Sequence, residues 1–101
     1  MTRTYQIVLP AEFDARAEYE AEQRGLLDYV KVRFEAGATY SVCFFTPSRI
    51  AVGLDFIREG GEACMADPGM IVVPTVTRGE MEKAVQYLTS SNYFRRLLPD
   101  T

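Results

Sequence analysis

Two segments with alternating apolar side chains stand on either side of a short turn signal, and this pattern constrains the fold more than any other part of the chain. Residues 28–34 (DYVKVRF) and 39–45 (TYSVCFF) are rich in β-branched and aromatic residues, and Gly37 lies in the EAGA sequence between them. Such a pattern is typical of an antiparallel β-hairpin. The residues expected to share a face within each strand are Val30, Val32 and Phe34, and Tyr40, Val42 and Phe44.

The N-terminal part predicts one more strand and a helix. Residues 4–9 (TYQIVL) form a short β-rich run that ends at Pro10. Residues 11–24 contain strong helix formers, and Gly25 follows them as a residue that commonly ends a helix. The apolar face of this helix is narrow, which predicts a position on the surface. Its members are Phe13, Ala17 and Ala21.

Residues 47–59 fit both a strand and a helix. Their apolar residues alternate as in a strand, but some of them also stand at helical spacing. Thr46 is a good N-cap, Pro47 suits the first helical position, and the glycines at 60–61 are a stop signal. These start and stop signals favour the helix. The residues at helical spacing are Ile50, Leu54 and Ile57.

The C-terminal half predicts a second strand pair and a last helix. A turn at residues 67–69 (DPG) separates two apolar runs, so residues 63–66 and 70–73 are expected to pair as strands. A helix is predicted from Arg78 to about Thr89 because its apolar residues recur at i, i+3, i+4 and i+7. These residues are Met81, Ala84, Val85 and Leu88.

The order of these elements predicts one α+β domain over residues 1–101, with a mainly antiparallel sheet and helices on one face. The first six elements follow the split βαβ arrangement of ferredoxin-like folds, to which a C-terminal helix is added. This likeness concerns the fold and carries no activity with it.

Composition excludes or disfavours several classes of function. The chain has no histidine, so imidazole cannot act as a base, an acid or a zinc ligand. Its two cysteines match no metal or redox spacing. Fourteen acids against eleven bases give a net charge of −3, which disfavours a nucleic-acid binder. No signal-peptide pattern and no apolar stretch of membrane length is found, so the expected location is cytoplasmic.

No catalytic grouping is apparent. The serines have no base beside them, and Cys43 in SVCFF has no imidazole partner and is expected to be a buried, inert thiol. An acidic stripe on the first helix could face a basic partner or hold a hard cation, but a solvated face explains the whole pattern without a ligand and is the favoured interpretation. Its members are Asp14, Glu18 and Glu22. We therefore expect no enzyme activity, no cofactor and no metal.

The hydroxyl-rich stretch TVTRGEME at residues 75–82 resembles a phosphate cradle at first sight. Thr77 and Glu80, however, have the spacing of a capping box, and Val76 and Met81 have that of a hydrophobic staple. A phosphate loop needs more glycines and a lysine at a fixed distance. The stretch is therefore interpreted as a helix start.

Two arginines stand where the helix dipole disfavours a cation. Arg49 and Arg78 each lie in the first turn of a predicted helix. They could share an anionic ligand, which makes them weak candidates for an anion site. Ion pairs with nearby carboxylates are the favoured interpretation, because acids are in excess and surface pairs are common.

The C-terminal segment combines apolar residues with arginines. Aromatic residues and arginine are enriched at protein interfaces, and they also suit stacking on single-stranded nucleic acid. A third interpretation is that the segment folds back and caps the core. The candidate interface residues are Tyr93, Phe94, Arg95, Arg96, Leu97 and Leu98.

The sequence thus predicts a small, non-catalytic protein-interaction module that self-associates as a homodimer. A further protein partner is compatible with this prediction, whereas nucleic acid and membrane are disfavoured. The alternative function is a sensor or carrier of an anionic metabolite that uses Arg49 and Arg78.

Overall fold

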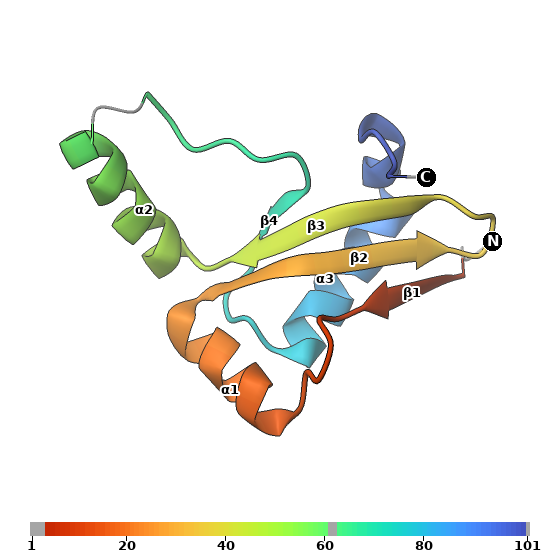
Figure 1. Ribbon diagram of the computed structural model, residues 1–101. Coiled ribbons are helices and arrows are strands. Elements are labelled where there is room, and N and C mark those ends of the chain that lie inside the picture. Colours follow the sequence, from red (N-terminus) through yellow and green to blue (C-terminus); the bar gives the residue numbers. More distant parts are fainter. Residues whose placement is uncertain (1–3, 61–62, 101) are drawn as a thin grey trace.

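The computed structural model describes residues 4–60 and 63–100, which form an α+β fold with three α-helices and a four-stranded mixed sheet (Figure 1). The predicted fold class is confirmed. In chain order the elements are β1 (Tyr5–Val8), α1 (Ala15–Arg24), β2 (Leu26–Phe34), β3 (Thr39–Phe45), α2 (Pro47–Gly60), β4 (Met70–Val72), α3 (Arg78–Ser90) and the 3₁₀ turn η1 (Tyr93–Arg96).

The predicted hairpin is confirmed as the antiparallel pair β2–β3. Val32 lies opposite Tyr40, and the alternating apolar residues of β2 are buried. Gly37 has a φ of 110° in the turn, a conformation that glycine adopts without strain. The register shifts between Leu27 and Val30, so a bulge interrupts the ladder near the start of β2.

The strand order is β1-β2-β3-β4, and the ferredoxin-like arrangement is not confirmed. In a split βαβ unit the helix joins two parallel strands with another strand between them. Here α1 joins β1 and β2, which are direct antiparallel neighbours. Gly25 makes this short connection possible: its φ of 69° ends α1, and β2 begins at the next residue. A Cβ at this position would lie 2.3 Å from Thr46 Oγ1.

The predicted strand at residues 63–66 is wrong, although the turn that follows it is present. The N–H of Met70 donates to the carbonyl of Asp67 at 3.2 Å, but residues 63–66 have no strand structure. Instead β4 pairs in parallel with β3. The free edge of the long strand β3 offers a full row of backbone groups to β4, whereas Met65, in the segment that leads from α2 to β4, lies against α2 near Gly53.

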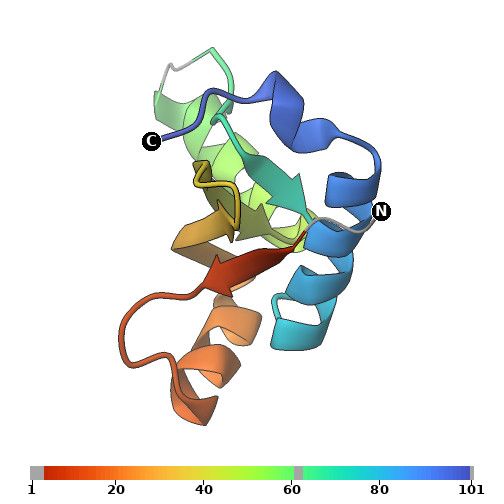
Figure 2. The same cartoon turned by 90° about the vertical axis from the view of Figure 1, so that its right-hand side faces the viewer.

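The main core lies between the sheet and α3 (Figures 1 and 2). Met81 and Val85 of α3 are buried against apolar residues of β2, β3 and β4, and Ala21 brings α1 into the same cluster. The hydroxyl of Tyr5 donates to Glu82 at 2.8 Å and joins β1 to α3. The helix α1 begins four residues later than the sequence predicts, because Asp14 is its N-cap and accepts from the N–H of Ala17 at 2.9 Å.

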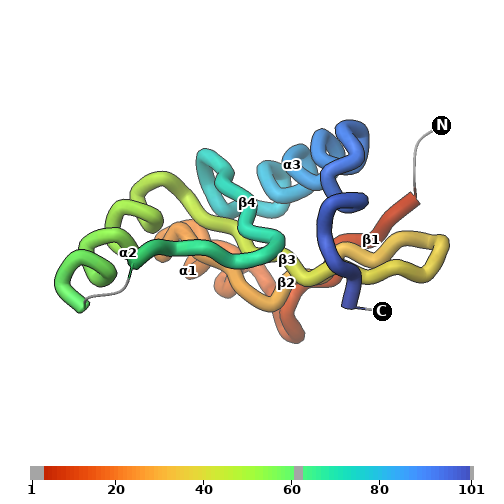
Figure 3. Tube along the Cα trace, turned by 90° about the horizontal axis from the view of Figure 1, so that it is seen from above, coloured from red at the N-terminus to blue at the C-terminus, as the bar shows by residue number. Residues whose placement is uncertain are grey.

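The helix predicted at residues 47–59 is confirmed as α2, but it does not cover the sheet. It extends away from the other elements, at the end of the molecule opposite the β2–β3 turn (Figures 1 and 3). The molecule therefore measures 45 × 31 × 21 Å and has a radius of gyration of 14.3 Å. A compact domain of this length has a radius of about 13 Å.

Candidate interaction surfaces

The helix α2 has an apolar surface that the chain does not bury. None of its residues is buried, although it is the most apolar of the three helices. Val52 and Leu54 are 44% exposed and Phe56 is 68% exposed. At 3.6 residues per turn, these side chains and the neighbouring Ile50 and Ile57 spread over about half of the helix circumference.

One side of α2 is partly covered by the segment that leads to β4. Met65 lies so close to the helix backbone that a Cβ on Gly53 would come within 2.7 Å of its sulfur atom. Phe56 and Ile57 border the same hollow, together with Cys64. This contact covers only the part of the helix around Gly53. Val52, which borders a separate hollow beside the end of α1, and Leu54 both remain 44% exposed.

The accessible surface of the whole chain is large for its mass. A compact monomer of 11.4 kDa exposes about 5,800 Å². This chain exposes 6917 Å². The surplus of about 1,100 Å² is comparable with the area of about 800 Å² that each partner buries in a standard protein interface.

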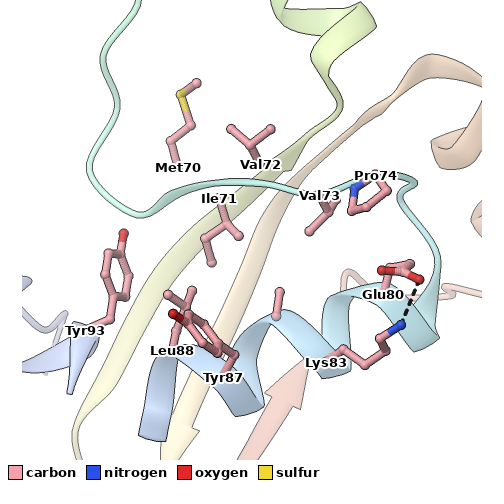
Figure 4. A pocket seen from close by; sticks show the side chains of 11 residues that line it. Met70, Ile71, Val72, Val73, Pro74, Glu80, Lys83, Tyr87, Leu88 and Tyr93 are labelled. Atoms are coloured by element: carbon pink, nitrogen blue, oxygen red, sulfur yellow. Dashed lines mark hydrogen bonds and ion pairs between the residues drawn. The ribbon is translucent and has the colours of Figure 1, made fainter. Parts of the chain in front are cut away.

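A second apolar surface is a groove between β4 and α3 (Figure 4). Its floor is formed by Ile71 and Leu88, and its most exposed apolar members are Val72 (53%) and Tyr87 (71%). A polar pair borders the groove, in which Lys83 Nζ donates to Glu80 Oε1 at 3.2 Å. The other residues that line the groove are Met70, Val73, Pro74, Ala84 and Tyr93.

The backbone of β4 also presents an open edge beside this groove. The N–H of Val73 donates to Phe45 and the carbonyl of Gly69 accepts from Cys43, so the alternate residue Val72 directs its backbone groups away from β3. The strand is only three residues long and Pro74 follows it, two features that limit pairing at an edge. The groove is therefore a poorer docking place for a strand than its apolar lining suggests.

The C-terminal segment packs on its own core. Phe94 is 1% exposed and makes ring contacts with Phe34 and Tyr40 at 5.4 and 5.3 Å between centroids, and Tyr93 and Leu97 lie against the same cluster. Of the six candidate interface residues, Arg95, Arg96 and Leu98 remain exposed. The structure thus agrees with the interpretation of this segment as a cap.

The two candidate anion-binding arginines do not form one site. Arg78 stacks over the ring of Phe13 at 5.0 Å, donates to the Phe13 carbonyl and lies 3.6 Å from Glu18. Arg49 borders a different hollow, next to Thr75 and the end of α1, and its side chain has no ion pair with the part of the chain that is described. Arg78 therefore serves to join α3 to α1.

The acidic stripe of α1 is divided among separate roles. Asp14 caps the helix, Glu18 binds Arg78, and Glu22 is exposed. Across residues 4–60 and 63–100, no group of acidic or cysteine side chains could hold a metal ion.

The capping box at the start of α3 is only half formed. Thr77 Oγ1 accepts from the N–H of Glu80 at 3.3 Å, and Val76 and Met81 are both buried as the staple requires. The Glu80 carboxylate pairs with Lys83 instead of returning to the N–H of Thr77. A full positive charge one turn away is the stronger partner for a carboxylate.

The two cysteines differ in their surroundings. Cys43 is half-buried on β3, and burial, with Asp28 and Asp67 adding to the effect, raises the pKa of its thiol to about 11. Its thiol is therefore protonated at neutral pH, although Cys43 is only half-buried and not buried as the sequence predicts. Cys64 is exposed beside α2.

No protein-family model matches the chain, and neither a curated protein nor a solved structure is significantly similar to it. None of the described helices is both long and apolar enough to cross a membrane.

The sequence indicated the exposed arginines and Leu98 but missed Val52, Phe56 and Tyr87. For α2 a signal was present, since apolar residues at both strand and helix spacing leave a helix apolar on more than one side.

Proposed function

We propose that this chain is a small, non-catalytic protein-interaction module that self-associates through surface outside its own core. The observation that carries the proposal is α2, a 14-residue helix with an apolar surface and no buried residue. The C-terminal segment, which the sequence suggested as the interface, contributes little to the proposal because most of its apolar side chains lie against the core.

A helix such as α2 needs a surface to pack against. Isolated helices of about this length are only marginally stable in water, and most helix stability in proteins comes from packing of the apolar face. Each Å² of apolar surface that leaves water contributes about 25 cal/mol. Covering Val52 and Phe56 therefore stabilises both the helix and the complex.

A second copy of the chain is the simplest partner. Closed two-fold dimers are the commonest assemblies, because one surface on two copies is self-complementary. The surplus of accessible surface, about 1,100 Å² per chain, is enough for an interface of standard size. The alternative function, binding of an anionic metabolite by Arg49 and Arg78, receives less support because Arg78 already pairs with Glu18.

Sedimentation velocity over a wide range of protein concentration tests the proposal. We expect the wild-type chain to shift from monomer to dimer, and the double variant Val52→Ser, Phe56→Ser to remain a folded monomer. Leu98→Ser is the matched control, because Leu98 is 92% exposed and lies outside α2. A wild-type chain that stays monomeric at every concentration contradicts the proposal.

A further inference from the structure

One stripe along α2 has charged residues at its two ends and apolar residues between them. Arg49, Val52, Phe56 and Glu59 stand at i, i+3, i+7 and i+10, a spacing that places them on one side of a helix. Val52 and Phe56 are among the most exposed apolar side chains of the chain. We call these four residues the α2 stripe.

The two charges of the α2 stripe have no ion-pair partner within the described part of the chain. Arg58 pairs with Asp55 at 3.5 Å on another side of the helix. By contrast, neither the guanidinium group of Arg49 nor the carboxylate of Glu59 forms an ion pair with any residue in the described ranges. They lie at opposite ends of the helix, about 15 Å apart along its axis.

Their positions are also unfavourable for an isolated helix. Arg49 lies in the first turn, near the positive end of the helix dipole, and Glu59 lies in the last turn, near the negative end. An antiparallel helix alongside α2 reverses this situation. Its negative end then lies beside Arg49 and its positive end beside Glu59, so both charges become favourable.

The α2 stripe is complementary to itself when it is inverted. A two-fold axis that crosses the α2 stripe halfway between Val52 and Phe56 places Arg49 opposite Glu59 of a second copy, and Val52 opposite Phe56. Two Arg49–Glu59 ion pairs then flank two Val52–Phe56 contacts. Each of these contacts joins a small side chain to a large one, an arrangement that packs well between helices. The same relationship does not arise in a parallel pair, where each charge meets its own kind.

We propose that α2 packs antiparallel against α2 of a second copy through the α2 stripe, with reciprocal Arg49–Glu59 ion pairs. This inference rests on the proposed self-association and specifies its surface and geometry. Because α2 extends away from the sheet, much of the helix is accessible to a helix of another copy (Figure 1). At the start of α2, Arg49 and Val52 border a hollow beside the end of α1 and Thr75, where the C-terminal end of the second α2 would lie. The groove between β4 and α3 takes no part in this interface.

Charge exchange between two variants tests the inference directly. Arg49→Glu alone and Glu59→Arg alone each place like charges opposite each other twice in a homodimer, and each is expected to weaken dimerisation at least about tenfold. In an equimolar mixture, a heterodimer of the two variants has opposite charges at both ends of the interface. The two substituted side chains face each other at one end, and the unchanged Glu59 and Arg49 face each other at the other. We therefore expect the mixture to form heterodimers with near wild-type affinity, measured by native mass spectrometry with one variant carrying a mass tag.

The control exchanges charges elsewhere on the same helix. The double variant Asp55→Arg, Arg58→Asp retains the pair within the chain and lies outside the α2 stripe, so it is expected to dimerise like the wild type. Circular dichroism of each single variant shows whether it is folded, and formation of heterodimers confirms that both variants retain a competent α2.

The outcomes separate this inference from the proposed function. If the wild type dimerises but the mixture forms no heterodimer, self-association stands and the antiparallel α2 interface is wrong. The same conclusion follows if both charge variants dimerise normally while Tyr87→Ser in the β4–α3 groove does not. If the wild type is monomeric throughout, both proposals are wrong.

Discussion

Asp100, near the C-terminal end of the chain, binds Lys31 in the middle of β2, with 2.8 Å between the carboxylate oxygen and the ammonium nitrogen. The same oxygen accepts from the hydroxyl of Ser41 at 2.6 Å, and the N–H of Asp100 donates to the carbonyl of Thr39. These contacts attach the C-terminal segment to the β2–β3 hairpin. The segment is thus held at Asp100 as well as by the burial of Phe94.

The attachment of Asp100 is expected to weaken in acid. Hydrogen bonds from Lys31 and Ser41 hold the pKa of Asp100 below its ordinary value of 3.8. A carboxylate with a lowered pKa in the folded state stabilises that state above its unfolded pKa, and this contribution is lost as the pH falls through the folded value. The Asp100 amide should therefore lose protection from hydrogen exchange below about pH 4. Asp100→Asn should show reduced protection already at neutral pH, whereas Glu35→Gln, an exposed control, should not.

Removing the cap of α3 should destabilise the fold. Thr77→Ala deletes the hydroxyl that accepts from the N–H of Glu80 and is expected to lower the free energy of unfolding by about 1 kcal/mol. Thr75→Ala is the matched control, because Thr75 is exposed and caps no helix. Urea denaturation of both variants measures the difference. Equal stability of the two variants would show that the hydroxyl of Thr77 contributes nothing as a cap.

The two thiols should react at different rates. Cys64 is exposed and is expected to be labelled readily by iodoacetamide at neutral pH. Cys43 is half-buried with a pKa of about 11, so it holds very little thiolate and should react slowly until the chain unfolds. Mass spectrometry of digested samples over time distinguishes the two sites. Labelling of Cys43 as fast as Cys64 would be inconsistent with the packing around β3.

Arg78 is expected to act in stability and not in anion binding. Arg78→Ala removes the contacts with Glu18 and Phe13, which join α3 to α1, and should lower the free energy of unfolding by up to about 1 kcal/mol. Arg95→Ala, which changes an exposed residue of η1, should have a smaller effect. Phosphate should not raise the melting temperature of the wild type specifically. A phosphate-dependent rise that the double variant Arg49→Ala, Arg78→Ala abolishes would favour the metabolite-binding alternative.

Local signals in the sequence predicted most of the elements. The alternation in residues 28–34 and the turn at Gly37 are short-range features, so the hairpin could be inferred without knowledge of the rest of the fold. Thr46 and Thr77 likewise indicated where α2 and α3 begin. The C-terminal segment fitted a cap on the core and an interface equally well, because aromatic side chains next to polar ones are typical of both.

Long-range relationships were beyond this kind of inference. The turn at residues 67–69 suggested a hairpin, but β4 pairs with β3, and strand pairing across such a distance leaves no local pattern. The spacing of the apolar residues in α2 indicated a helix that is apolar on more than one side, but it did not show that the helix is left unburied. Burial depends on where the rest of the chain lies. The groove residues Val72 and Tyr87 escaped notice for the same reason.

Hydrogen exchange of the α2 amides at low and high protein concentration tests the central claim most directly. If another copy covers α2, its amides should exchange rapidly in dilute solution and become protected as the concentration rises, because packing stabilises a helix that is marginal on its own. The amides in the middle of α3, which packs on the core in every copy, provide the internal reference and should change little. Protection of α2 that is the same at all concentrations would contradict self-association through this helix.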